Sequence, residues 1–351
     1  MVPLGYARAR NIMKLFTVGA IAIAGLASAC SGTGTPGVTG PSSANSGGTS
    51  IGTGVAPGTA VFSQSPIDIS DLTEIVPLGN LNPPGHTLPT NHAYFFHRAV
   101  ANAVVTAPAA GTVTTVQRGA DDQLMIAVSP GFDFYIAHVL LDAEIVQGGR
   151  ISSGQRLGVT SSAAGAMDLG VINNAVTLFF VRPERYIAGT LHGDSPLKYF
   201  AEPVRGDLYA KVSRAGPDKD GQISFDRAGR LAGNWFTPDL QPSVTETFGN
   251  GSKHLSFARD VADPDRVRIS IGGSLSMTGA FFVDAGALDP ADVSASSGVV
   301  TYQLFFSPRA QMRAGTLLVQ MLADDRLKVE AFANTSTPPV AFTDRAVSYV
   351  R

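Results

Sequence analysis

Short segments in which apolar and polar residues alternate recur along this 351-residue chain, and glycine-rich turns separate them. Residues 123–128 and 132–141 are two such segments, and residues 317–322 and 327–331 flank the turn sequence ADDR. Alternation with a period of two puts one set of side chains on each face of a β-strand, and no long segment repeats its apolar residues at the helical period. The pattern predicts an all-β protein with antiparallel hairpins.

Two series of these segments divide the chain. The first covers residues 104–181, and the second begins at residue 222, where about seven strands favour an antiparallel β barrel or sandwich. Pro183 and Pro196 each open a short segment that predicts one turn of helix. We therefore expect a β domain at residues 61–185, a connecting segment at 186–221 and an antiparallel β domain at 222–351.

The first 30 residues have the pattern of a bacterial lipoprotein signal. Three basic residues precede an apolar stretch at residues 15–26, which is too short to span a bilayer comfortably. Small residues follow and end at Cys30, the only cysteine in the chain. We expect residues 1–29 to be a signal peptide and Cys30 to carry a lipid. The alternative is a cleaved signal peptide with an unmodified cysteine beside it.

The next segment and the charge balance indicate where the protein resides. Residues 31–60 consist mainly of Gly, Ser, Thr and Pro, a composition that cannot bury a core and predicts a flexible tether. The tether and lipid anchor together predict a protein exported into the periplasm and held on the cell envelope, at the outer membrane or cell surface. The 26 basic and 28 acidic residues form no basic patch in the body of the chain, which argues against a nucleic-acid partner.

One part of the chain carries a family resemblance. Residues 104–116 read VVTAPAAGTVTTV, and they are followed by YIAHVLL and then by GGRISSGQRLGVT. In this order the segments resemble the lysostaphin-like (LytM-type) zinc endopeptidases, and the resemblance covers residues 78–181. It implies a barrel-sandwich hybrid, the fold shared with biotinyl and lipoyl carrier domains, and a substrate in the peptide bridges of bacterial cell wall.

The resemblance also shows which zinc ligands have changed. The family binds zinc through the His and Asp of an HxxxD motif and the second His of an HxH motif, and leaves one position open for water. The HxH motif falls at AGAMDLGV, where Asp168 stands among apolar residues and no histidine is present. The HxxxD motif falls at GHTLPTNH, where His86 is followed four residues later by Thr90. The domain therefore resembles a degenerate member.

Three functions are consistent with these residues. The first is an envelope lipoprotein whose non-catalytic lysostaphin-like domain binds a cell-wall component or a protein partner, with no cofactor. The second is a zinc-dependent peptidoglycan endopeptidase with a rearranged site, in which His86, His92 and Asp168 bind the metal. In that hypothesis His138, which matches a family histidine near the metal, is the catalytic residue. The third is a lipophilic-ligand carrier that uses the C-terminal barrel, suggested by the G-x-W sequence that ends at Trp235.

Overall fold

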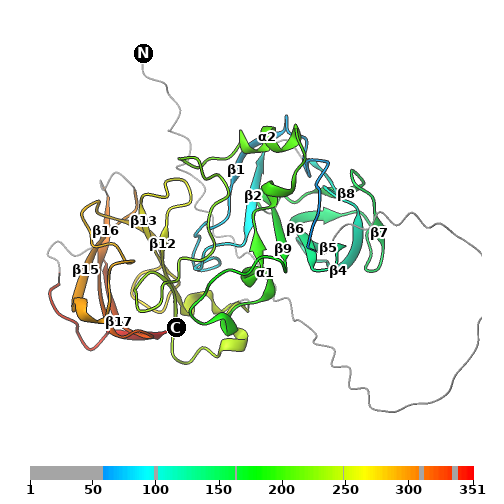
Figure 1. The fold of residues 1–351 in the computed structure, drawn as a ribbon. Helices are drawn as coiled ribbons and strands as arrows, with labels where there is room; N and C mark the ends of the chain where they lie inside the picture. The colour runs from blue at the N-terminus through cyan, green and yellow to red at the C-terminus, as the bar shows by residue number, and fades with distance from the viewer. Residues whose placement is uncertain (1–57, 99–101, 163, 248, 308–311, 334–338) are drawn as a thin grey trace, which may run out of the picture.

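The computed structural model describes residues 58–98, 102–162, 164–247, 249–307, 312–333 and 339–351. The predicted signal peptide, Cys30 and most of the predicted tether lie outside these residues. The described chain forms two β structures, which confirms the all-β prediction. Figure 1 shows the first sheet, coloured blue to green, on one side of the molecule and the barrel, coloured yellow to red, on the other. In the described part of the chain, no helix is both long and apolar enough to cross a membrane.

The first structure is a ten-stranded sheet in which β1, β2, β9, β6, β5, β4 and β7 are neighbours in that order. Strand β10 pairs with β9, and β8 pairs with both β3 and β6. The strands are β1 (Leu72–Val76), β2 (His92–His97), β3 (Val104–Thr106), β4 (Gly111–Gln117), β5 (Asp122–Ser129), β6 (Phe132–Leu141), β7 (Arg150–Ile151), β8 (Arg156–Thr160), β9 (Ala166–Asn173) and β10 (Gly193–Asp194). All of the pairings named here are antiparallel.

Side chains that precede and follow the main strands in the sequence also contribute to the core of the first sheet. Phe62 precedes the sheet, and its ring centroid lies 5.4 Å from that of Phe134 and 5.1 Å from that of Phe200. Phe200 and Leu208 belong to the segment expected only to connect the domains, yet both are fully buried in this core. Burying a Phe or Leu side chain contributes about 1.5–3 kcal/mol, so that segment helps to stabilise the first sheet.

The second structure is a closed antiparallel barrel of eight strands, β11 to β18, which selects the barrel from the two expected alternatives. The strands are β11 (Gly233–Phe236), β12 (His254–Arg259), β13 (Val267–Ile271), β14 (Gly279–Val283), β15 (Val299–Phe305), β16 (Arg313–Ala323), β17 (Arg326–Ala333) and β18 (Val347–Val350). The sequence did not predict β18. Strands β16 and β17 pair across the expected ADDR turn.

Large side chains fill the barrel core. Trp235, Tyr302 and Tyr349 are fully buried there, and the indole Nε1–H of Trp235 donates to the Leu231 carbonyl at 2.8 Å. Trp235 and Tyr302 supply apolar volume while the polar atom of each donates to a backbone carbonyl. The carrier hypothesis for the barrel stays a prediction.

Short helices and one extended segment lie outside the strands; the first four helices precede the barrel in the chain, and the last three lie between barrel strands. The helices are η1 (Pro183–Arg185), α1 (Ala188–Leu191), η2 (Pro196–Tyr199), α2 (Val204–Tyr209), η3 (Pro242–Val244), η4 (Asn250–Lys253) and η5 (Ala295–Ser297). The turns expected after Pro183 and Pro196 are present as η1 and η2, whereas α2 was not predicted. Residues 176–181 were expected to form a strand, but they are not in a ladder. Leu178 and Phe180 instead pack in a cluster between the two structures, where Phe180 stacks on Tyr186 with ring centroids 3.9 Å apart.

The barrel also contacts the loop that carries His86. The Thr87 hydroxyl donates to the Gly251 carbonyl at 2.8 Å. A Cβ atom added to Gly251 would lie 1.9 Å from the Pro84 carbonyl oxygen, so only glycine allows the backbones to approach this closely. The second structure therefore holds the loop in front of β2.

Candidate functional site

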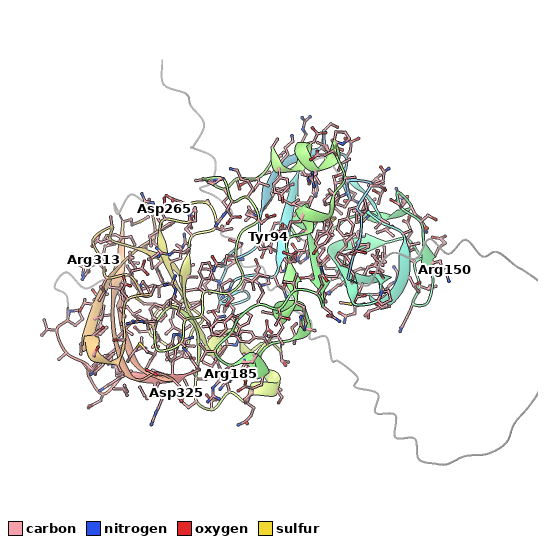
Figure 2. All side chains as sticks on the ribbon, viewed as in Figure 1. Tyr94, Arg150, Arg185, Asp265, Arg313 and Asp325 are labelled. Atoms are coloured by element: carbon pink, nitrogen blue, oxygen red, sulfur yellow. The ribbon has the colours of Figure 1, made fainter. Side chains whose placement is uncertain are left out.

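Three neighbouring strands and one loop bring the predicted site residues together. His92 begins β2 and lies opposite Gly170 of β9, while Tyr94 lies opposite Asp168. On the other side of β9, Ala137 of β6 lies opposite Asp168, and His138 follows it. Figure 2 marks Tyr94 in β2, on the side of the first sheet nearer to the barrel. His86 comes from the loop before β2.

The four predicted residues form one cluster around the Asp168 carboxylate. Oδ2 of Asp168 lies 3.3 Å from Nε2 of His92 and 3.2 Å from Nε2 of His138. The His86 and His92 rings meet edge to face with centroids 5.3 Å apart. His97, the third histidine of the proline-rich segment, lies outside the cluster, and its Nδ1 contacts the Arg98 carbonyl.

His138 is a cation held between two carboxylates. Its Nδ1 pairs with Asp121, and its Nε2 pairs with Asp168. Burial by itself lowers the pKa of His138, but the hydrogen bonds and charges of Asp121 and Asp168 outweigh it and raise the pKa to about 10. His138 also has a positive φ of 64°, a left-handed conformation uncommon outside glycine. Sequence reasoning missed Asp121, because a polar residue in the turn between β4 and β5 reads as an ordinary turn residue.

The other two imidazoles are neutral. Burial and the neighbouring His92 lower the pKa of His86 to about 4. Burial also lowers the pKa of His92 below its ordinary value, more strongly than the charge of Asp168 raises it. The cluster near pH 7 thus contains two neutral rings, one imidazolium and two carboxylates.

Asp168 stays ionised although it is buried. Burial raises the pKa of its carboxyl group, but its contacts with His92 and His138, including a hydrogen bond with His138, lower it below the ordinary value. Among the described residues, Oδ1 of Asp168 and Nε2 of His92 have no hydrogen-bond partner. The 3.3 Å contact between Nε2 of the neutral His92 ring and Oδ2 of Asp168 therefore lacks hydrogen-bond geometry.

Polar side chains that the sequence did not single out orient His92. The Tyr135 hydroxyl donates to Oδ1 of Asn91 at 2.7 Å, and Nδ1 of His92 lies 3.2 Å from the same oxygen. Tyr135 stands over Gly170, where an added Cβ would lie 2.2 Å from the ring. Gly170 therefore makes room for the ring that contacts Asn91. The alternation of residues along the strands gives no signal for these roles.

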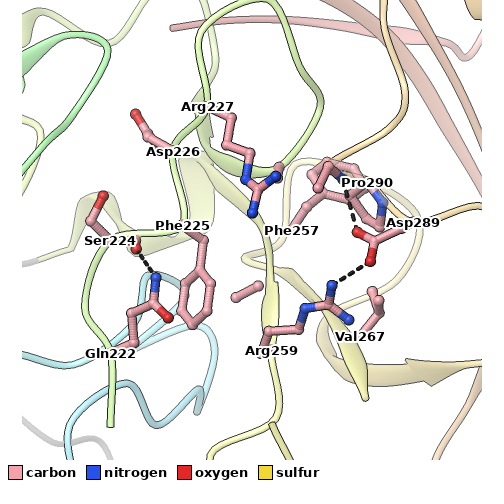
Figure 3. A pocket seen from close by; sticks show the side chains of 13 residues that line it. Gln222, Ser224, Phe225, Asp226, Arg227, Phe257, Arg259, Val267, Asp289 and Pro290 are labelled. Carbon is pink, nitrogen blue, oxygen red and sulfur yellow. Dashed lines mark hydrogen bonds and ion pairs between the residues drawn. The ribbon is translucent and has the colours of Figure 1, made fainter. Parts of the chain in front are cut away.

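A separate hollow lies away from this cluster, at the wall of the barrel. It holds about 150 Å³ and is lined by Gln222, Phe225, Arg227, Arg259 and Asp289 among others. Figure 3 shows the Arg227 and Arg259 guanidinium groups on its wall, with Arg259 ion-paired to Asp289. None of the predicted site residues contributes to it.

Comparisons with known proteins give structural matches only. No protein-family model matches the chain, and no curated protein sequence matches it. A zinc containing peptidase from Vibrio cholerae is 19% identical, with 32% of this chain and 37% of that chain covered and a TM-score of 0.27. Csd3 from Helicobacter pylori is 16% identical, with 41% of this chain and 34% of that chain covered and a TM-score of 0.29.

A third match is the catalytic domain of the prophage-encoded M23 protein EnpA from Enterococcus faecalis. It is 16% identical, with 33% of this chain and 87% of that chain covered and a TM-score of 0.25. This chain spans just over a third of the length of the Vibrio and Helicobacter proteins. The Vibrio structure is named a peptidase and the EnpA structure an M23 protein, and each matches only about a third of this chain.

Proposed function

We propose that this chain is an envelope-anchored lipoprotein whose first domain is a degenerate, non-catalytic lysostaphin-like module that binds a cell-wall component or an envelope protein. The anchor is the lipidated Cys30, and the tether at residues 31–60 holds the body away from the membrane. The resemblance of residues 78–181 supports the cell-wall class of partner. The state of His138 supports the absence of catalysis.

The observation that carries the proposal is the pairing of both His138 nitrogens. Asp121 and Asp168 each accept one N–H of its imidazolium. A general base needs a free nitrogen lone pair at the operating pH, and a pKa of about 10 leaves His138 without one near neutrality. The ion pair also places positive charge against Asp168, the one carboxylate in the stretch that matches the family's HxH motif.

The cluster as it lies does not fit the family's zinc. That metal needs three protein ligands whose lone pairs converge on one point. Within the described residues, no group of three His, Cys, Asp or Glu side chains is arranged to hold a metal ion. Asp168 already shares its Oδ2 with the charged His138 at 3.2 Å, and a divalent cation would meet that charge.

One observation favours the second candidate, a zinc-dependent endopeptidase with a rearranged site. Nε2 of His92 and Oδ1 of Asp168 are both buried without a hydrogen-bond partner among the described residues. An unsatisfied buried polar atom costs about 1–3 kcal/mol, and a cation that binds both atoms would recover that loss. His86 would supply the third ligand, and His138 would have to release Asp168.

Metal content and cell-wall binding separate the two candidates. The purified chain is prepared without chelators, its zinc is quantified, and it is then incubated with insoluble peptidoglycan. The proposal expects sedimentation with peptidoglycan, or capture of an envelope protein, without released peptides and without a change in His86→Ala. Stoichiometric zinc that is lost in both His86→Ala and His92→Ala, together with release of cell-wall peptides, would establish the endopeptidase instead.

The anchor has its own test. Cells that express the chain with Cys30→Ala are fractionated beside cells with the unchanged chain, and Ser31→Ala serves as the matched control. The proposal expects the cysteine variant to leave the membrane fraction, because no acyl chain can then be attached. Membrane retention of Cys30→Ala would refute the lipid anchor. The binding proposal is tested separately, by the peptidoglycan experiment.

A further inference from the structure

A continuous line of hydrogen bonds runs from the second domain to His92. Oε1 of Glu246, which lies in the loop after β11, accepts from the Thr190 hydroxyl at 2.6 Å. Thr190 belongs to α1, and its oxygen accepts from Nδ2 of Asn91 at 3.1 Å. Asn91 Oδ1 then accepts from the Tyr135 hydroxyl and lies 3.2 Å from Nδ1 of His92. Thr190 is buried, so water does not freely replace these contacts.

The direction of each hydrogen bond follows from its acceptor. Above a pH of about 7 the Glu246 carboxyl group is ionised and only accepts, so the Thr190 O–H points at Glu246 and the Thr190 lone pairs face Asn91. Asn91 must then present its NH₂ group to Thr190, which turns its carbonyl oxygen toward Tyr135 and His92. The Tyr135 hydroxyl also lies 3.3 Å from Nδ1 of His92, but its one hydrogen goes to Oδ1 of Asn91 at 2.7 Å. Both oxygens around Nδ1 can then only accept from it, so the hydrogen of the neutral His92 ring belongs on Nδ1.

We propose that the second domain, acting through Glu246, Thr190 and Asn91, holds His92 in the tautomer that carries its hydrogen on Nδ1. The Nε2 lone pair of His92 then faces Oδ2 of Asp168 at 3.3 Å without a hydrogen between them. This explains why Nε2 lacks a hydrogen-bond partner among the described residues. The inference goes beyond the proposed function, because it makes Glu246, Thr190 and Asn91 positioning residues and gives the second domain a role at the cluster.

The opposite tautomer is the one that the cluster alone would favour. A hydrogen on Nε2 would be donated to the buried Asp168 carboxylate, and a hydrogen bond to a charged group is worth about 1.5–3 kcal/mol. The line of hydrogen bonds from Glu246 must therefore outweigh that preference. Removing the Thr190 hydroxyl allows the Asn91 amide to rotate by about 180°. The His92 ring is then more stable with its hydrogen on Nε2.

The test reads the tautomer directly by long-range ¹H–¹⁵N NMR of the histidine rings of the full chain, at a pH well above 7, where Glu246 is ionised and His92 is neutral. The chain has six histidines, and the His92 signals are assigned by their loss in His92→Gln. Thr190→Val removes the hydroxyl with little change in volume, and Thr190→Ser keeps it as the matched control. His254 is an internal reference, since its Nε2 faces the Thr245 carbonyl at 3.0 Å and must carry a hydrogen.

The unchanged chain and Thr190→Ser should both show a protonated Nδ1 and a bare Nε2 on His92. Thr190→Val should move the protonated signal to Nε2 while the His254 signals stay in place, and Glu246→Ala should do the same. A His92 ring protonated on Nε2 in the unchanged chain would overturn the proposal. So would a Thr190→Val protein with unchanged His254 signals and His92 still protonated on Nδ1.

Discussion

Glu246 accepts the Thr190 hydroxyl hydrogen bond across the boundary between the barrel and the first sheet, with 2.6 Å between the two oxygens. Its second oxygen accepts the backbone N–H of Ile187 at 2.6 Å. Burial raises the pKa of Glu246 to about 7, and these two hydrogen bonds lower it only in part. The boundary between the domains therefore holds a carboxyl group that titrates near neutrality.

Glu246→Gln should remove a pH dependence of stability between about pH 4.5 and 7. Because the folded pKa lies above the unfolded value, the contribution of this group is complete below pH 4.5 and is lost as the pH rises to about 7. A rise of the Glu246 pKa from 4.5 to about 7 corresponds to roughly 3 kcal/mol in the free energy of unfolding. Urea unfolding of both proteins across this window gives the difference, and the buried histidines contribute equally to each. Parallel curves would show that Glu246 is not the group responsible.

His138→Gln should flatten the loss of stability on the alkaline side. The folded pKa of about 10 lies above the unfolded 6.5, so the ion pairs stabilise the protein fully below pH 6.5 and are lost as the pH rises through about 10. The free energy of unfolding of the unchanged chain should fall by a few kcal/mol over this window. The variant should be less stable at pH 7, but its free energy of unfolding should fall less as the pH rises further. His97→Gln, outside the cluster, should keep the slope of the unchanged chain; a steep slope in His138→Gln would contradict the assignment.

Asp226→Asn should destabilise the barrel strongly. Oδ2 of Asp226 lies 3.2 Å from Nη1 of Arg351, whose guanidinium stacks over the Trp235 ring 4.3 Å from its centroid. Both charges are buried, so neutralising one leaves the other unpaired at a cost of about 3–5 kcal/mol. Asp239→Asn removes a surface pair with Lys253 and should change the free energy of unfolding little. Equal effects in chemical denaturation would argue against the buried pair.

Gly251→Ala should move the loop that carries His86. The new Cβ would sit 1.9 Å from the Pro84 carbonyl oxygen, a backbone atom that can yield only if the loop shifts. We expect a loss of about 1–3 kcal/mol together with altered NMR signals of His86. Gly286→Ala is the control, since nothing lies within 4 Å of an added Cβ there. Unchanged His86 signals in Gly251→Ala would mean that the barrel does not hold this loop.

Much of the fold followed from local pattern. Alternation within residues 123–128 and 132–141 predicted β5 and β6, because the period of two is a property of the strand itself. The same pattern failed at residues 176–181, where Leu178 and Phe180 pack in the cluster between the two structures and no strand partner is present among the described residues. Strand β18 and helix α2 are short, and their residues carry too little periodicity to predict them.

The family resemblance suggested His86, His92, His138 and Asp168 as one rearranged site, and the structure places them in one cluster. The charge states and the tautomer within this cluster depend on the tertiary structure. Asp121 turns His138 into a buried cation, and Glu246 reaches His92 through Thr190, from which it is 56 residues distant in the chain. Charge state and tautomer depend on burial and on partners from other elements, and neither quantity is encoded in the spacing of residues along one segment.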